Sequence, residues 1–334
     1  MSTSFDPDGP GLDGRLFGLP HDPADARVRV LPVPFEPTTS YRRGTAGAPA
    51  EILEASAQVD LFDLDCGNAW REGIALVDSP PEIAAWNEEA LAATDAAREG
   101  DIDALAVVDR AGERVNALCE RWVGEQLDGG GIPAVLGGDH SVALGGIVAA
   151  AQRFPSLGLL QVDAHADLRV AYEGFRWSHA SVMHNALEAA PGLTLAQVGV
   201  RDLGHGEFDR IQRDPRIHTL FDGPARDRMD GGEAWESVVQ GLIDPLPEDV
   251  WISFDVDGLQ PALCPSTGTP VPGGLTWYEA ASLLRHVVRS GRRIVGFDLC
   301  EVGDDPWDAI VGARLLYKLA CWSIVSHRPP GGSP

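Results

Sequence analysis

The sequence predicts an α/β protein with a three-layer α/β/α arrangement, in which helices cover both faces of a mostly parallel sheet. Short apolar segments alternate with helical segments through most of the chain, and this alternation is typical of parallel sheets. Hydrophobic residues make up 44% of the 334 residues, which is enough for a large core. No linker or internal repeat divides the chain. We therefore expect one domain over residues 28–328, a loosely docked arm over 1–27 and a frayed tail over 329–334.

The N-terminal part contains the first expected strand, at 28–33, followed by a loop rich in turn-forming residues. A short helix is expected at 50–57. Two acidic, alanine-rich stretches then predict helices at 81–97 and 103–127.

From residue 132 onward, apolar strands and helices alternate. The expected strands are 132–136, 157–162, 193–200, 216–221, 250–254, 294–297 and 322–326, and the expected helices are 141–153, 179–190, 206–213, 230–243, 276–290 and 308–320. Ligands of such sheets bind beyond the carboxyl ends of the strands, so polar residues at those ends are the candidates for function.

The composition of the chain argues against some binding partners and favours one cellular location. The net charge of −24 repels phosphate backbones and argues against nucleic-acid binding, while it weakly favours cationic substrates. The N-terminus lacks the pattern of a signal peptide, and no apolar run approaches the ~20 residues that span a bilayer. Five scattered cysteines fit a reducing compartment. We expect a cytoplasmic protein with no membrane or nucleic-acid partner.

Three strands end in residues of the types that bind metal ions. The motifs are GGDHS at 137–141, DAHAD at 163–167 and SFDVDG at 253–258. Carboxylates suit hard divalent cations and imidazole suits transition metals, and four carboxylates at one place would repel each other without cations. Taken singly, GGDHS is equally a helix N-cap and SFDVDG a turn. Together they predict a site for two cations about 3.5–4 Å apart, which lower the pKa of a shared water.

These motifs, in this order, resemble the ureohydrolase superfamily, which includes arginase, agmatinase and formimidoylglutamase. Further resemblance lies in PVPFEPTTSYRRGTAGAPAEILEAS after residue 31, in DLRVAYEGFRWSHASVM after the second motif, and in CPSTGTPVPGGL and GFDLCEV. It covers residues 28–325 and is nearest to agmatinase-type members. It implies an arginase-like fold.

The resemblance also implies a binuclear manganese site. Its six ligands would be His140, Asp163, His165, Asp167, Asp255 and Asp257. Asp163 and Asp255 would bridge the ions, with His140 and Asp167 completing one and His165 and Asp257 the other. Nickel and cobalt accept the same types of ligand.

Three further roles follow from the resemblance. Glu301 matches the glutamate that binds the guanidinium, and His179 matches a mobile histidine that contacts substrate and shuttles protons. Asp167 would assist proton movement as well as bind metal. In the agmatinase-type loop, Glu173 could face a distal ammonium, whereas Arg169 and Arg176 could instead receive a carboxylate.

The expected activity is hydrolysis of a linear guanidino compound, agmatine or similar, to urea and an amine. Formimidoylglutamase, guanidino-acid hydrolase and arginase activities remain alternatives, as does a non-catalytic metal-binding protein, although Glu301 and His179 favour an enzyme. Family resemblance implies a trimer or hexamer. Two departures leave the site's shape open: Gln260 replaces an acidic residue of the family pattern, and Ala180-Ser181 replaces Gly-Thr.

Overall fold

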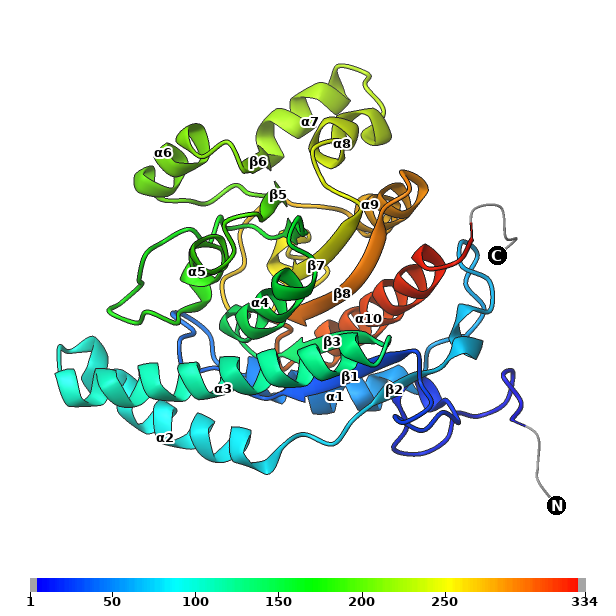
Figure 1. Ribbon diagram of the computed structural model, residues 1–334, viewed down its shortest axis with the longest axis horizontal. Helices are drawn as coiled ribbons and strands as arrows, with labels where there is room; N and C mark the ends of the chain where they lie inside the picture. Colours follow the sequence, from blue (N-terminus) through cyan, green and yellow to red (C-terminus); the bar gives the residue numbers. More distant parts are fainter. Residues whose placement is uncertain (1–4, 330–334) are drawn as a thin grey trace.

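An eight-stranded, entirely parallel sheet forms the centre of the computed structural model, which describes residues 5–329 (Figure 1). The strand order is β2-β1-β3-β8-β7-β4-β5-β6. The strands are β1 (Val28–Val33), β2 (Ile74–Leu76), β3 (Ile132–Gly137), β4 (Gly158–Val162), β5 (Thr194–Val198), β6 (Ile217–Leu220), β7 (Asp249–Asp255) and β8 (Arg293–Cys300).

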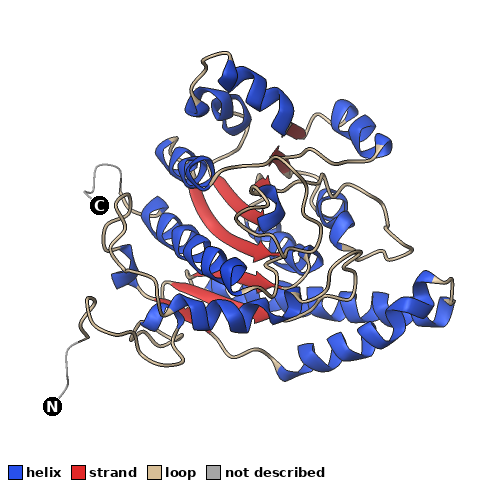
Figure 2. Ribbon diagram, turned by 180° about the vertical axis from the view of Figure 1, so that it is seen from behind, coloured by secondary structure: helices blue, strands red, loops and turns tan. Residues whose placement is uncertain are grey.

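Helices cover both faces of this sheet, which confirms the predicted three-layer architecture (Figure 2). One face packs against α1 (Ala48–Ser56), α8 (Trp235–Ile243), α9 (Trp277–Arg289) and α10 (Pro306–Ser326). The other packs against α3 (Ile102–Asp128), α4 (Ala143–Arg153), α5 (Val182–Ala189) and α6 (His205–Arg213). Helix α2 (Pro81–Arg98) lies beside α3, and α7 (Asp222–Asp230) precedes α8.

The two layers of core arise from the two-residue period of the strands. In β4, Leu160 joins the core under α8–α10 while Leu159 joins the core under α3–α5. In β3, Leu136 and Val135 divide in the same way. Because successive side chains point to opposite faces, a strand buried on both sides is apolar along most of its length. This is why these strands were recognisable as continuous apolar runs.

Several predicted elements differ from the structure. The expected strand at 322–326 is wrong, because α10 continues to Ser326 and buries Trp322 and Ile324. The helix expected at 230–243 begins later, because α8 spans Trp235–Ile243, and α7 over Asp222–Asp230 was not expected. The sequence analysis missed β2, which has only three residues and therefore little periodicity to detect. Strand β8 runs three residues further than expected, to Cys300, directly before Glu301.

The segment before β1 is packed more closely than a loosely docked arm. Leu16, Phe17 and Leu19 are buried in the core under α10. The Phe17 ring meets the Tyr317 ring edge-on at 4.9 Å. Residues 1–4 and 330–334, which include most of the expected frayed tail, lie outside the described part of the chain.

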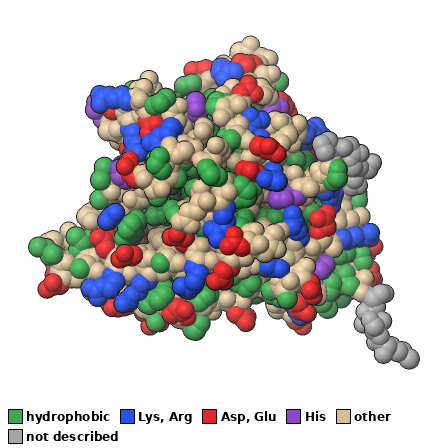
Figure 3. Space-filling view, viewed as in Figure 1, with side chains coloured by type: hydrophobic (Ala, Val, Ile, Leu, Met, Phe, Trp, Pro, Cys, Tyr) green, Lys and Arg blue, Asp and Glu red, His purple; other side chains and the backbone are tan. Residues whose placement is uncertain are grey.

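Helix α10 is long and apolar enough to cross a membrane, and it is the one such helix among the described residues. However, 72% of its apolar window is buried inside the protein. Its packing against β8 and α1 accounts for its hydrophobic sequence. On the face in Figure 3, basic side chains lie among acidic ones rather than apart from them.

Candidate metal centre

The predicted metal ligands follow the carboxyl ends of β3, β7 and β4, three of the four central strands. His140 begins a short 3-10 helix after β3, and the Asp139 carboxylate caps this helix by accepting from the Ser141 N–H at 3.1 Å. Asp163 follows β4 directly, and Asp255 ends β7. Parallel strands end at one edge of the sheet, so residues more than 100 positions apart meet there.

Two groups of ligand atoms form at this edge, and Asp163 belongs to both. The first contains His140, Asp163 and Asp255, and the second contains Asp163, His165 and Asp257. His140 Nδ1 lies 3.2 Å from Asp163 Oδ2 and 3.5 Å from Asp255 Oδ2. His165 Nδ1 lies 3.0 Å from Asp257 Oδ2 and 3.5 Å from Asp163 Oδ1. A shared carboxylate is the arrangement that two neighbouring cations require.

Asp167, the sixth predicted ligand, also reaches this cluster. Its Oδ2 lies 3.0 Å from His140 Nδ1, and its backbone adopts a left-handed φ of 52°. A non-glycine residue in this region is strained by about 1–3 kcal/mol, and such strain is typical of functional sites. The structure thus brings all six predicted ligands together.

The electrostatics of the cluster fit bound cations. Burial, together with the charges of Asp257 and Asp163, raises the pKa of Asp255 well above its usual range. Burial and the Asp163 charge raise the pKa of Asp167 to about 8. Burial opposes ionisation of His140, but Asp163 and Asp167 outweigh it and raise the His140 pKa. Within residues 5–329, the only cationic partners of the four aspartates in the cluster are His140 and His165. Divalent cations would supply the missing positive charge.

A second set of buried residues, which the sequence analysis did not assign, holds His140 from behind. His140 Nε2 lies 2.8 Å from Ser253 Oγ, and the Ser253 hydroxyl donates to Asp298 Oδ1 at 2.8 Å. The indole N–H of Trp251 donates to the other Asp298 oxygen at 2.7 Å. A hydrogen bond on the far ring nitrogen fixes the orientation of a metal-binding histidine. The feature of the sequence that could have revealed these residues is a serine in β7 and an aspartate in β8, both inside mostly apolar strands.

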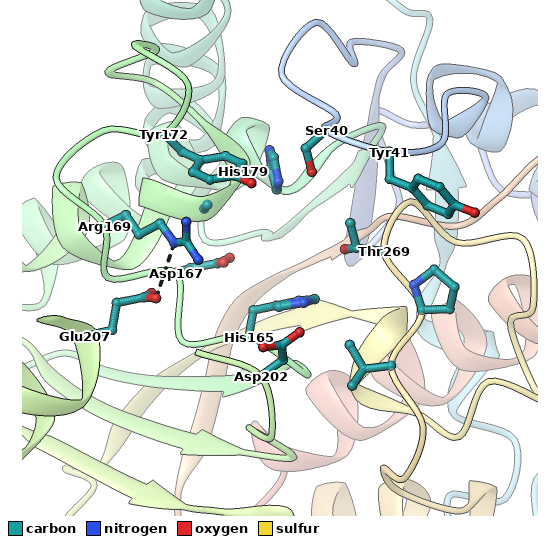
Figure 4. A pocket seen from close by; sticks show the side chains of 13 residues that line it. Ser40, Tyr41, His165, Asp167, Arg169, Tyr172, His179, Asp202, Glu207 and Thr269 are labelled. Carbon is teal, nitrogen blue, oxygen red and sulfur yellow. Dashed lines mark hydrogen bonds and ion pairs between the residues drawn. The ribbon is translucent and has the colours of Figure 1, made fainter. Parts of the chain in front are cut away.

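A cavity of about 340 Å³ opens onto the cluster (Figure 4). His165 and Asp167 line it, and His179 lies on the side opposite His165, next to Tyr172. Ala180, part of one of the two departures from the family pattern, also lines it. The remaining lining residues are Ser40, Tyr41, Arg169, Tyr172, Asp202, Glu207, Thr269, Pro270 and Val271.

His179 is held at the cavity by Thr38. The Thr38 hydroxyl accepts from the His179 backbone N–H at 3.1 Å and lies 3.3 Å from His179 Nδ1. The Tyr172 ring meets the imidazole edge-on at 5.8 Å. Burial and the charges of His165 and His140 lower the pKa of His179 to about 3. The ring is therefore neutral in this arrangement.

Glu301 lies behind the cavity rather than in its lining. Its Oε1 accepts from the His140 backbone N–H at 2.9 Å, whereas its Oε2 is buried without a hydrogen-bond partner among the described residues. Its backbone has a φ of 63°. Burial and the neighbouring Asp139 raise the pKa of Glu301 well above its usual range. A Cβ at Gly268 would lie 2.7 Å from Oε2, so a larger residue there would force the carboxylate to shift.

The structure does not bring Glu173 to the cavity. Its carboxylate instead accepts from Arg98 Nε at 2.6 Å. Arg169 does line the cavity, but its Nε donates to Glu207 at 3.3 Å and its guanidinium stacks 4.5 Å from the Tyr172 ring. Arg176 stacks on Trp177, outside this cavity. Gln260 makes backbone bonds to Leu275 and Leu263, and it belongs to neither group of metal-ligand atoms.

Comparison with known proteins agrees with this geometry. The model of the arginase family matches residues 26–321. The N(1)-aminopropylagmatine ureohydrolase of Thermus thermophilus is 34% identical over 289 residues, covering 86% of each chain, and that of Synechocystis is 31% identical over 301 residues, covering 89% of each. Among solved structures, the agmatine ureohydrolase of Thermoplasma volcanium has the same fold, with a TM-score of 0.72 at 24% identity over 93% of this chain and 94% of its own. The resemblance found in the sequence is thus confirmed, and the chain belongs to the arginase family.

Proposed function

We propose that this member of the arginase family hydrolyses a linear guanidino compound to urea and an amine, and that the substrate carries a cationic group at its other end. The observation that carries this proposal is the pair of buried His/Asp groups, joined by Asp163 and open to the cavity. A protein that only stored or sensed a metal would have no use for an adjoining cavity lined by polar and aromatic side chains.

The six clustered residues would hold two divalent cations. The first group is His140, Asp163 and Asp255 with Asp167 beside it, and the second is Asp163, His165 and Asp257. Such a pair of cations generates a nucleophile from water near neutral pH and polarises the substrate. The uncompensated charge of the buried carboxylates supports this occupancy.

Glu301 would hold the guanidinium over the reacting centre. A carboxylate accepts two parallel N–H bonds from a guanidinium, and such charge-assisted bonds fix the position of the central carbon. The free Oε2 atom of Glu301 supports this role. The bond from the His140 N–H to Oε1 ties the substrate-binding glutamate to a metal-binding segment.

Asp167 and His179 would assist departure of the amine, Asp167 by proton transfer and His179 by hydrogen bonding. Asp167 Oδ2 lies in the metal cluster, and Asp167 lines the cavity, so it can accept a proton there and pass it to the departing amine. A neutral His179 can hydrogen-bond the leaving nitrogen, with Thr38 orienting its ring.

A negative charge in the cavity, the carboxylate of Asp202, favours a cationic tail on the substrate. Arg169 is paired with Glu207, whereas the exposed Asp202 carboxylate forms no ion pair among the described residues. Tyr172 and Tyr41 provide aromatic walls, which attract ammonium groups. The two relatives with 31% and 34% identity are named for aminopropylagmatine, whose tail is a polyamine. Agmatine and N(1)-aminopropylagmatine are therefore the proposed substrates.

The test is product release by the manganese-loaded protein: urea from agmatine, N(1)-aminopropylagmatine, arginine and guanidinobutyrate, and formamide from N-formimidoylglutamate. We expect turnover of one or both amine-tailed compounds and its loss in Asp163→Asn. Faster turnover of guanidinobutyrate, or of N-formimidoylglutamate, would mean that the substrate carries an acidic tail and not a cationic one. Arg169 would then be the residue that binds the carboxylate of the substrate. Neither urea nor formamide from any of these compounds, by a protein that binds two metals, would favour a non-catalytic protein.

Manganese as the native metal and assembly into a trimer or hexamer stay predictions from the family resemblance. A cytoplasmic location stays a prediction from the cysteine content and the N-terminal sequence. Metal analysis of the purified protein and its mass in solution test the first two directly.

A further inference from the structure

A row of polar residues crosses the buried sheet just below the metal cluster. Thr219, Gln197, Gln161, Ser253 and Asp298 are register partners on β6, β5, β4, β7 and β8. All except Thr219, which is half-buried, are fully buried. They lie on the sheet face that packs against α3–α5. Two residues earlier on the same face of their strands, Leu159, Leu195 and Trp251 belong to the apolar core. Buried amides are costly unless they are hydrogen-bonded, so this row needs a function or a full set of partners.

On the β4–β6 side, the row is a directed chain of hydrogen bonds that ends on Asp163. The Thr219 hydroxyl donates to Gln197 Oε1 at 2.8 Å. Gln197 Nε2 donates to Gln161 Oε1 at 2.6 Å and to the Ala166 carbonyl at 2.8 Å. Gln161 Nε2 then donates to Asp163 Oδ2 at 2.7 Å. Each acceptor sets the orientation of the amide before it, so the direction of the whole chain is fixed by chemistry.

This chain controls both the side chain and the loop that carry the metal ligands. Asp163 Oδ1 accepts from the His165 backbone N–H at 2.6 Å, and Oδ2 accepts from Gln161, so the carboxylate is held at both oxygens. The bond from Gln197 to the Ala166 carbonyl fixes the backbone next to Asp167. Because Asp163 belongs to both groups of ligand atoms, its orientation affects both proposed cation positions at once.

We propose that Gln161 and Gln197, with Thr219 at the far end, are positioning residues that hold Asp163 as the carboxylate shared by two cations. The proposal rests on the metal centre proposed above, and it adds residues that touch neither substrate nor reacting atoms. Loss of the Gln161 amide would leave Asp163 free to rotate toward one cation and weaken its hold on the other.

The test is a calorimetric titration of the metal-stripped full-length protein with Mn²⁺, for the wild type, Gln161→Met and Thr219→Val. Methionine keeps the length of the glutamine side chain but has no N–H donor. Leu160→Val is the matched control, because it alters the neighbouring residue on the opposite face of β4. Thermal unfolding reports the stability of each variant, and the electron paramagnetic resonance spectrum of the Mn²⁺-loaded protein reports coupling between the two ions.

We expect Gln161→Met to weaken Mn²⁺ binding about 10- to 100-fold and to reduce the coupling signal. Thr219→Val should have a smaller effect in the same direction, and Leu160→Val should bind as the wild type does. Wild-type affinity and coupling in Gln161→Met would overturn the proposal, as would an equal loss in Leu160→Val. If Gln161→Met does not fold, unchanged binding by Thr219→Val overturns it. A wild-type protein that binds no Mn²⁺ would instead overturn the proposed function.

Discussion

At the scale of single residues, Glu301 offers the sharpest separation of substrate binding from metal binding. Glu301→Gln keeps the shape of the side chain but removes the negative charge that a guanidinium requires. A lost charge-assisted bond costs about 1.5–3 kcal/mol, so kcat/KM should fall at least ~10-fold. Mn²⁺ stoichiometry should stay at the wild-type value, because Glu301 belongs to neither ligand group. Loss of bound metal in this variant would place Glu301 in the metal centre instead.

Asp202 gives a residue-scale test of the substrate's tail. Asp202→Asn removes a cavity carboxylate that forms no ion pair within residues 5–329, so KM for agmatine should rise about 2- to 5-fold, the small effect of an exposed ion pair. Guanidinobutyrate, which lacks a cationic tail, serves as the control compound, and any turnover of it should not slow. An equal loss for both compounds would mean that Asp202 supports the site rather than reads the tail.

At the scale of elements, Arg98 at the end of α2 joins two loops that line the cavity. It donates to Glu173 in the loop that carries Tyr172, and its Nη2 donates to the Thr39 carbonyl at 2.7 Å, beside Ser40 and Tyr41. Glu173 therefore affects the cavity through Arg98, and a direct role in substrate binding is not needed. Glu173→Gln should lower kcat/KM about equally for agmatine and for N(1)-aminopropylagmatine, measured by urea release. A change confined to one substrate would restore the direct contact that the sequence suggested.

A second element-scale prediction concerns stability where α10 meets the loop before β2. Lys318, the one lysine of the sequence, lies 2.6 Å from Asp63 Oδ2 and 3.3 Å from Asp65 Oδ2. Burial alone would raise the pKa of Asp63, but the bond to Lys318 and two backbone N–H bonds outweigh burial and lower it. The carboxylate therefore stabilises the fold above its unfolded pKa of about 3.9, and this contribution is lost as the pH falls through the lower folded value.

Lys318→Met should therefore lower the free energy of unfolding by about 1–3 kcal/mol at pH 7, because Asp63 is left buried without its cation. The difference from the wild type should shrink as the pH falls below about 4, where Asp63 of the variant takes up a proton. Denaturant unfolding at several pH values measures this. A pH-independent difference would assign the loss to packing of the lysine stem and not to charge.

At the scale of the whole molecule, metal should contribute to the stability of the fold. The four clustered carboxylates come from two segments of the chain, 163–167 and 255–257, and they repel each other without cations. Mn²⁺ at 100 times its dissociation constant should add about 2.7 kcal/mol per ion to the free energy of unfolding. Melting curves with and without a chelator test this, and identical curves would contradict a metal centre at this edge of the sheet.

Much of the molecule could be predicted from sequence because apolar strands and ligand motifs are local patterns. The six metal ligands stood in three such motifs, and the structure gathers them. The pairing of Glu173 with Arg98 could not be predicted, since 75 positions separate these residues and only the fold brings them together. The end of α10 was mistaken for a strand because β-branched and aromatic residues there are buried on a helix. Gln161 and Gln197 stand out in the sequence as polar residues in apolar strands. Their hydrogen bond to each other depends on the strand register, which the sequence does not give.

The last strand of the sequence occupies the middle of the sheet. β8 separates β3 and its N-terminal neighbours from β7, β4 and the strands beyond. His140 therefore belongs to one half-sheet, Asp163 and Asp255 belong to the other, and Glu301 comes with the strand that joins them. A ribosome makes the chain from the N-terminus at about 5–20 residues per second. During synthesis, the two halves stay unjoined until residues 293–300 emerge, so a chain released before then would carry all six predicted metal ligands but no assembled site.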